Sequence, residues 1–145
     1  MTAEQDPLTA TLHQINRVRG FCRHRMLTTV PTGVPQDPNN CPIKRALQCY
    51  RPNIGIYSGF ALVEGRATAI ELKELWGTSW SCDTNHGPEK NGRGRFGQRL
   101  YKVNLTDDMT RFVEGFDIEE FADLIDPRAY ARFQVANPEL FAGVS

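Results

Sequence analysis

The spacing of apolar residues predicts a helix at the start of the chain. Five apolar residues recur at intervals of three and four, which places them in one stripe along a helix. The stripe consists of Leu8, Leu12, Ile15, Val18 and Cys22. Asp6 can cap this helix, and Pro7 fits its first position because no hydrogen-bond partner is needed there. We therefore expect an amphipathic helix that begins at Pro7.

A loop and a short second helix are expected next. Residues 28–40 contain three prolines and one glycine, a composition typical of a loop. Asn39 or Asn40 can cap a helix over residues 41–47, and the Arg-Pro-Asn sequence at 51–53 ends it.

Two short apolar runs then predict a β-hairpin. Residues 54–57 and 60–63 are rich in β-branched and aromatic residues, and Ser58 and Gly59 separate them. Residues 100–105 form a similar run and predict another strand. We therefore expect a small antiparallel sheet, either a hairpin or a meander.

Two segments between these strands are less regular. In residues 68–75 apolar and charged positions alternate, as in a half-buried strand, but Thr68 and Glu71 also form a capping box that favours a helix. We expect a strand that continues the sheet. Residues 77–99 are rich in turn-forming residues and predict a long loop, which in a compact domain is usually functional or mobile.

Three short helices are predicted at the end of the chain. Thr106 can cap the first, Asp117 and Glu120 form a capping box for the second, Asp126 opens the third, and the Asn-Pro sequence at 137–138 stops it. Their apolar faces hold Phe112, Val113, Phe116, Ile118, Phe121, Ala122, Ile125, Tyr130 and Phe133.

Composition fits one small domain. The chain has 145 residues, of which 40% are hydrophobic, enough for one ordinary core. We expect a single α+β domain over residues 1–145, with a small antiparallel sheet packed with short helices. No run approaches the roughly 20 apolar residues of a membrane helix, and the N-terminus lacks the regions of a secretory signal. These features predict a cytoplasmic protein with no membrane partner.

Charge is distributed unevenly along the chain. Seventeen basic and seventeen acidic residues cancel. However, residues 1–102 hold fourteen Lys and Arg against eight Asp and Glu, whereas residues 103–145 hold three against nine. This split predicts a bipolar surface if the fold keeps the two stretches apart. The alternative is that the acidic helices pack beside the basic part and neutralise it.

The Gly- and Arg-rich segment 90–99 is a candidate binding surface. Glycines let the backbone approach a phosphate, arginines fork onto its oxygens, and an aromatic ring can stack on a base. A second basic cluster lies in the first helix. The predicted contact residues are Lys90, Arg93, Arg95, Phe96 and Arg99 of the segment and Arg17 and Arg23 of the helix. The alternative is a solvated loop or hairpin without a ligand.

The cysteines and histidines allow two kinds of chemistry. No Cys-x2-Cys pair of a structural zinc site occurs, and the nearest substitutes are Cys22 with His24 and Cys82 with His86. Cys82 and His86 also supply the thiol and base of a nucleophilic enzyme. We favour reduced, partly buried thiols with no metal and no other cofactor. Since no nucleotide-binding, hydrolase or metalloprotease motif occurs, the sequence leaves open whether the protein is an enzyme.

Two sequence segments carry a resemblance to a known group of proteins. Residues 41–47 read Cys-Pro-Ile-Lys-Arg-Ala-Leu and precede a predicted strand at 54–56. Residues 105–117 contain Phe112, Val113 and a final Phe-Asp. Together they resemble the Cys-Pro-Val-x-x-Ala-Leu and Leu-Pro-x-Glu…Phe-Ile-x-x-Phe-Asp patterns of small uncharacterised proteins of actinobacteria and their phages, with Thr in place of the Pro. The resemblance implies an accessory protein of the kind that phages encode, acting in the host cytoplasm, and carries over no activity.

These observations predict a small non-enzymatic binding protein. Its basic Gly/Arg segment would contact nucleic acid, or its acidic helical tail would contact a host protein. The tail is rich in aromatic residues, which are favoured at the centres of interfaces. The alternative class is a Cys- and His-dependent hydrolase or a zinc-binding protein. The sequence leaves the oligomeric state open.

Overall fold

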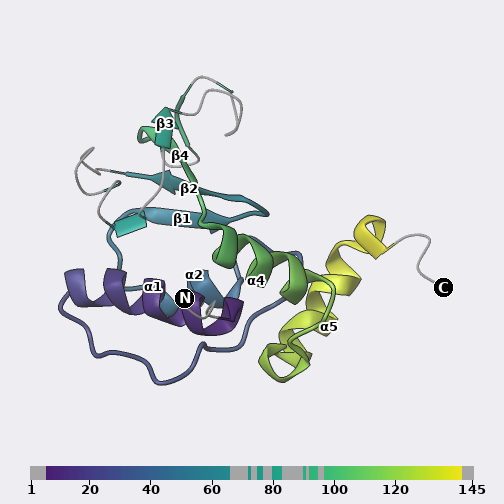
Figure 1. Ribbon diagram of the computed structural model, residues 1–145. Coiled ribbons are helices and arrows are strands. Elements are labelled where there is room, and N and C mark those ends of the chain that lie inside the picture. The colour runs from purple at the N-terminus through teal and green to yellow at the C-terminus, as the bar shows by residue number, and fades with distance from the viewer. Residues whose placement is uncertain are drawn as a thin grey trace.

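The computed structural model describes residues 6–65, 72, 75–76, 80–82, 90, 92–94 and 97–141. It has the predicted α+β architecture, with a four-stranded antiparallel sheet in the order β1-β2-β4-β3 and helices beside it (Figure 1). The strands are β1 (Asn53–Ile56), β2 (Phe60–Glu64), β3 (Trp80–Cys82) and β4 (Leu100–Asn104). The described helices are α1 (Pro7–Phe21), α2 (Pro42–Ala46), α4 (Asp107–Asp117) and α5 (Pro127–Ala136), with the 3-10 helices η1 (Ala122–Leu124) and η2 (Pro138–Phe141).

The core joins one face of the sheet to α1, α2 and α4. Ile54 of β1 and Val63 of β2 belong to the same buried cluster as Ile15 of α1, Ile43 of α2 and Phe112 of α4. All five side chains are at most 1% exposed. Burial of apolar surface from elements far apart in sequence is therefore what holds the helices on the sheet.

The structure confirms the N-terminal helix and its cap. Asp6 is the N-cap residue, and its carboxylate accepts a hydrogen bond from the backbone N–H of Thr9 at 3.0 Å. Pro7 occupies the first turn, as predicted. In the apolar stripe Ile15 and Val18 are fully buried, while Leu8 and Leu12 are partly buried. Local sequence signals were therefore sufficient for this element.

The C-terminus of α1 adopts a conformation that favours glycine. Arg23 has a φ of 58°, and its N–H donates to the carbonyl of Gly20 at 3.0 Å. The N–H of His24 donates to the carbonyl of Arg19 at 2.9 Å. These two bonds form a Schellman motif, in which the residue at the position of Arg23 is usually glycine.

Replacing Arg23 with glycine is therefore expected to stabilise the protein. A left-handed conformation costs an L-residue about 1 kcal/mol, and glycine avoids this cost. The free energy of unfolding of Arg23→Gly, measured by urea denaturation, should rise by up to about 1 kcal/mol. Arg17→Gly is the matched control, because Arg17 is exposed within the helix and glycine there should destabilise by about 1 kcal/mol. A loss of stability in Arg23→Gly would contradict the prediction.

The sheet contains the predicted hairpin and last strand. β1 and β2 pair antiparallel with Ile56 opposite Ala61, and Ser58 and Gly59 form the turn. Gly59 has a φ of 84°, which explains the glycine there. β4 also forms as predicted and pairs with β2.

Two predictions for the central segment are wrong. Of residues 68–75, the described Leu72 and Leu75 are helical, not extended, as is the following Trp76. Their spacing of three and one places all three on one side of a helix, and all are buried in the core. The segment 77–99 is not a continuous loop, because β3 lies within it and pairs with β4. The other residues of 68–75 lie outside the described part of the chain.

Two of the predicted helix starts also differ from the structure. Cys41 is the N-cap of α2 without a side-chain cap bond, and Asn40 instead donates to Asp37 at 2.7 Å. Asp117 does not cap a second tail helix but is the last residue of α4. Its carboxylate accepts the N–H of Gln36 at 2.7 Å. A long-range hydrogen bond therefore takes the place of the predicted local cap. Where the second tail helix was expected, only the short 3-10 helix η1 forms.

The first and third tail helices begin as predicted, but Ile118, expected on the apolar face of the second, is 70% exposed. Thr106 caps α4 by accepting from the N–H of Met109 at 3.2 Å, and Phe112 is buried. Asp126 caps α5 by accepting from the N–H of Ala129 at 3.2 Å. α5 ends before Asn137 as predicted. Across the part of the chain that is described, no helix has the length and apolarity needed to cross a membrane.

The position of Asp117 gives a prediction about pH. Burial raises the pKa of its carboxyl group, and the hydrogen bond from Gln36 offsets only part of this effect. The folded state therefore holds this proton to a higher pH than the unfolded state, so stability falls as pH rises through this window, from about pH 4 upward. Asp117→Asn keeps an acceptor for Gln36 but carries no charge.

We expect Asp117→Asn to be more stable than the wild type at pH 7 and to show no such advantage at pH 3. Urea denaturation at both values measures the difference. A variant that is less stable at pH 7 would show that the ionised carboxylate is favoured in the fold.

Candidate functional site

The predicted Gly/Arg segment forms a tight hairpin in its described part. Arg93 and Arg99 lie opposite each other in an isolated antiparallel bridge. The N–H of Gly94 donates to the carbonyl of Gln98 at 2.9 Å. The N–H of Gly97 donates to the carbonyl of Gly94 at 3.0 Å. Residues directly opposite in such a pair project to the same side, so the two arginines share one face. Lys90 is exposed, whereas Arg95 and Phe96 lie outside the described residues.

Gly94 has a packing role within this hairpin. A Cβ atom at Gly94 would overlap the carboxyl group of Glu64 on β2. Glu64 is only 6% exposed, so its side chain cannot easily move aside. The lack of a side chain at Gly94 thus accommodates the Glu64 side chain of the same chain, so this glycine leaves no space for a ligand there.

The second basic cluster does not join the hairpin. Arg17 and Arg23 are exposed on or just after α1, which packs against α4 and α2. The hairpin precedes β4, at the end of the sheet far from α1 (Figure 1). The predicted nucleic-acid contacts thus form two separate surfaces.

The predicted Cys and His ligands are likewise dispersed. Cys22 and His24 lie at the C-terminus of α1, Cys82 lies on β3, and His86 is outside the described residues. Among the residues that the structure describes, no three His, Cys, Asp or Glu side chains are placed to hold a metal ion. Burial raises the pKa of the Cys41 thiol to about 12, which keeps this thiol protonated and unreactive.

The acidic closing stretch contacts the basic stretch at one ion pair within the described residues. Arg45 lies 3.0 Å from the carboxylate of Asp126. The other described ion pair, between Arg111 and Asp108, is internal to α4. Glu120 and Asp123 are exposed. Charged side chains of the tail are thus left on the surface, beside a groove.

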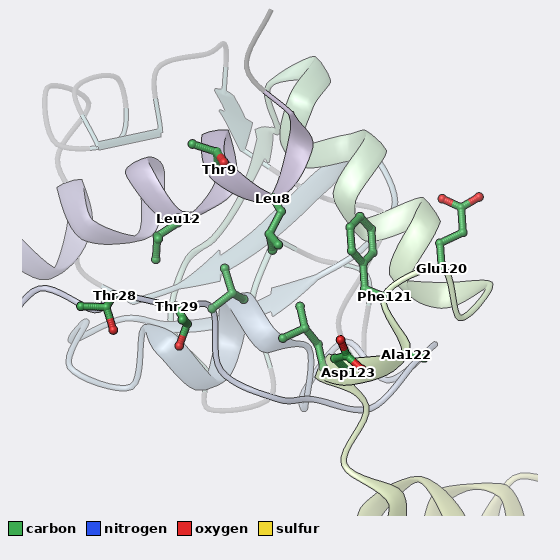
Figure 2. Close-up of a pocket in the computed structure, with 11 residues that line it drawn as sticks. Leu8, Thr9, Leu12, Thr28, Thr29, Glu120, Phe121, Ala122 and Asp123 are labelled. Atoms are coloured by element: carbon green, nitrogen blue, oxygen red, sulfur yellow. The ribbon is translucent and has the colours of Figure 1, made fainter.

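This groove lies between α1, the loop after it and η1, and we call it the α1–η1 groove (Figure 2). Its volume is about 590 Å³. Leu8 and Leu12 point into it from α1, and Phe121 faces it from the opposite wall (Figure 2). The lining residues are Leu8, Thr9, Leu12, Thr28, Thr29, Val30, Glu120, Phe121, Ala122, Asp123 and Leu124. The groove therefore has an apolar floor and a polar rim whose charged members are acidic.

Hydrogen bonds hold the loop wall of the groove at both ends. At one end, Asn16 of α1 donates to the carbonyl of Leu27 at 3.0 Å and accepts its N–H at 2.8 Å. At the other end, the N–H of Gly33 donates to the carbonyl of Leu124 at 2.8 Å, and its carbonyl accepts the N–H of Asp126 at 2.9 Å. The loop wall, residues 27–33, is thus fixed to α1 at one end and, at the other, to the end of η1 and the segment that follows it.

The η1 wall is anchored to the core. The ring of Phe121 lies 5.0 Å from that of Phe112, which is fully buried in α4. Arg45 of α2 also donates to the carbonyl of Thr32 and to the carboxylate of Asp126. These bonds join the loop wall and the segment after η1 to α2. A groove whose walls are fixed before binding loses little conformational entropy when a ligand enters.

Sequence reasoning missed this groove. Its lining comes from three segments that are far apart in the chain, and no periodicity links them. The one available signal was the excess of aromatic residues in the acidic tail, to which Phe121 belongs. Comparison of the chain with family models, curated proteins and solved structures finds no match, so the inference of function rests on the residues themselves.

Proposed function

We propose that the protein is a non-enzymatic accessory protein that binds another protein through the α1–η1 groove. The observation that carries this proposal is the chemistry of the lining, which joins an apolar floor to two acidic residues, Asp123 and Glu120, the carboxylate of Glu120 pointing outward (Figure 2). Its described lining holds no His, Cys, Lys or Arg. An apolar floor beside acidic side chains suits the recognition of an amphipathic partner.

The lining also indicates the kind of partner. A basic, amphipathic helix can place apolar side chains against Leu8, Leu12 and Phe121 while its cations lie near the acidic rim. Burial of one large apolar side chain contributes about 1.5–3 kcal/mol. The exposed carboxylates contribute mainly to orientation and to the rate of association.

A model peptide tests this function. The peptide carries Leu at helical spacing and Lys elsewhere, and the comparison peptide has Glu in place of every Lys. We expect the Lys peptide to bind the wild type at least about tenfold more tightly, as measured by fluorescence anisotropy at about 1 µM protein. Equal binding of the two peptides would contradict an acidic site.

Charge reversal locates the binding. Glu120→Lys with Asp123→Lys should weaken binding of the Lys peptide by about tenfold or more. The control is Asp107→Lys with Glu119→Lys, which makes the same charge change at exposed positions outside the groove lining. If the control pair weakens binding equally, the peptide responds to net charge and the groove is not its site.

A second candidate function is binding of single-stranded nucleic acid by the hairpin and the neighbouring sheet face. Arg93 and Arg99 share one face of the hairpin. On the sheet, Lys102 lies 4.6 Å from the ring of Phe60, which is stacked on Tyr57 at 5.0 Å. Cations beside stacked aromatic rings are typical of such surfaces. The Glu64 side chain, which fills the space beside Gly94, argues against close approach of a ligand there.

A gel-shift series over salt concentration tests the second candidate. Affinity for a single-stranded oligonucleotide should fall steeply with salt, since phosphate contacts release counterions. Arg93→Ala with Arg99→Ala should reduce that dependence. No binding at low salt excludes this function.

A further inference from the structure

We define the C-terminal arm as α5 and η2. Its residues are not buried against the rest of the described protein. None of the residues of α5 is buried. The aromatic rings of the arm contact each other, with Phe141 lying 6.0 Å from Tyr130 and 6.2 Å from Phe133. Val135 is 83% exposed and Leu140 is 46% exposed. Figure 1 shows the arm extending away from the sheet and α1.

The arm has the chemistry that the groove favours. Although the tail as a whole is acidic, α5 contains two arginines and no acidic residue. Arg128 and Arg132 are four residues apart, so they lie on one side of the helix, and both are exposed. Within the arm, α5 is thus a short basic helix with exposed apolar side chains, and η2 after it carries one acidic residue, Glu139. The groove, by contrast, is apolar with an acidic rim.

The arm is held away from the groove of its own chain. α5 begins at Pro127, shortly after Leu124, which lines the groove. Asp126 between them is fixed by its backbone bond to Gly33 and by Arg45. Figure 2 shows the chain descending from the groove toward α5. A short, clamped connection of this kind does not allow the helix to turn back.

We propose that two copies of this chain associate by placing the arm of each copy in the α1–η1 groove of the other. This inference rests on the proposed function of the groove as a protein-binding site and names a second copy as its occupant. A twofold arrangement fills both grooves and covers both arms, so the assembly closes as a dimer. A different partner then has to compete with the arm.

Sedimentation velocity of the full chain gives the first test. The mass should rise from the 16.4 kDa of one chain toward twice that value as concentration increases over about 1–200 µM. Val135→Asp should shift this transition to at least about tenfold higher concentration. Ile118→Asp, at a position 70% exposed but outside the arm and the groove lining, should leave it unchanged. A wild type that stays monomeric throughout overturns the proposal.

Two charge-reversed variants give a sharper test. The first has a basic groove (Glu120→Arg with Asp123→Arg), and the second has an acidic arm (Arg128→Glu with Arg132→Glu). Each variant alone pairs like charges and should be monomeric where the wild type is dimeric. An equimolar mixture pairs opposite charges at both contacts and should form a dimer. A mixture that stays monomeric, or variants that dimerise alone, would overturn the arrangement.

The outcomes separate this inference from the proposed function. A monomeric wild type that still binds the Lys peptide through the groove retains the function and loses the dimer. If the wild type neither dimerises nor binds the peptide, both proposals fail. If it dimerises and charge reversal behaves as expected, excess Lys peptide should dissociate the dimer.

Discussion

Replacing Phe112 with alanine is expected to lower the free energy of unfolding by about 3–5 kcal/mol, because its ring is fully buried and the surrounding core cannot close the cavity. Its ring lies 6.1 Å from Phe116 and 5.0 Å from Phe121. The substitution therefore removes packing within α4 and the anchor of the η1 wall at once.

Urea denaturation followed by tryptophan fluorescence measures this effect. Ile118→Ala is the control, because Ile118 is 70% exposed and lies outside the arm and the groove lining, so its truncation should change stability by no more than about 0.5 kcal/mol. The Phe112 variant should also bind the Lys peptide more weakly, since Phe121 loses its support. A loss below about 1 kcal/mol would contradict the assignment of Phe112 to the centre of the core.

Replacing Gly33 with alanine is expected to destabilise the protein by about 3 kcal/mol and to distort the groove. A Cβ atom there would overlap the ring and nitrogen of Pro42 and lie 2.7 Å from the carbonyl oxygen of Asn40. None of these atoms can rotate away, because they belong to backbone or to a proline ring. The hydrogen bonds of Gly33 to Leu124 and Asp126 must then lengthen or break.

The matched control is Gly20→Ala. A Cβ atom at Gly20 would meet only the end of the flexible Met26 side chain, at 3.0 Å. Since Gly20 lies in α1, alanine should be neutral or stabilising by up to about 1 kcal/mol. Equal stability of the Gly33 and Gly20 variants in urea would show that the contact at Pro42 is not tight.

Local signals predicted those parts of the fold that depend on neighbouring residues. The caps at Asp6, Thr106 and Asp126 and the turn at Gly59 are each specified within four residues. Such bonds form wherever the chain is helical or turned, so tertiary packing did not alter them. For the same reason the α+β class followed from the pattern of apolar positions.

The errors arose where a distant residue decided the outcome. Asp117 was expected to cap a helix through Glu120, but the N–H of Gln36, 81 positions away, binds its carboxylate. Residues 68–75 fitted a strand slightly better than a helix in pattern, but burial of Leu72 with Trp76 selected the helix. Propensity is a weak guide where tertiary contacts compete.

The groove could not be predicted for a related reason. Gly33 fixes the loop wall of the groove to Leu124 through a backbone hydrogen bond that no sequence pattern indicates. Glu120 was interpreted only as part of a helix cap. The charge split did indicate an acidic surface in the tail. It did not indicate that α5 within that tail is basic, because net charge over a long stretch hides the sign of one helix.

We propose that the α1–η1 groove, and not the Arg93–Arg99 hairpin, is the binding surface. The most direct measurement is a titration of the isotope-labelled protein with the Lys peptide, followed by amide chemical shifts in NMR spectra. We predict that the largest shifts fall on Thr9, Thr28, Thr29 and residues 120–124. The largest shifts on residues 92–99, or shifts spread evenly over the acidic surface, would show that the peptide does not bind in the groove.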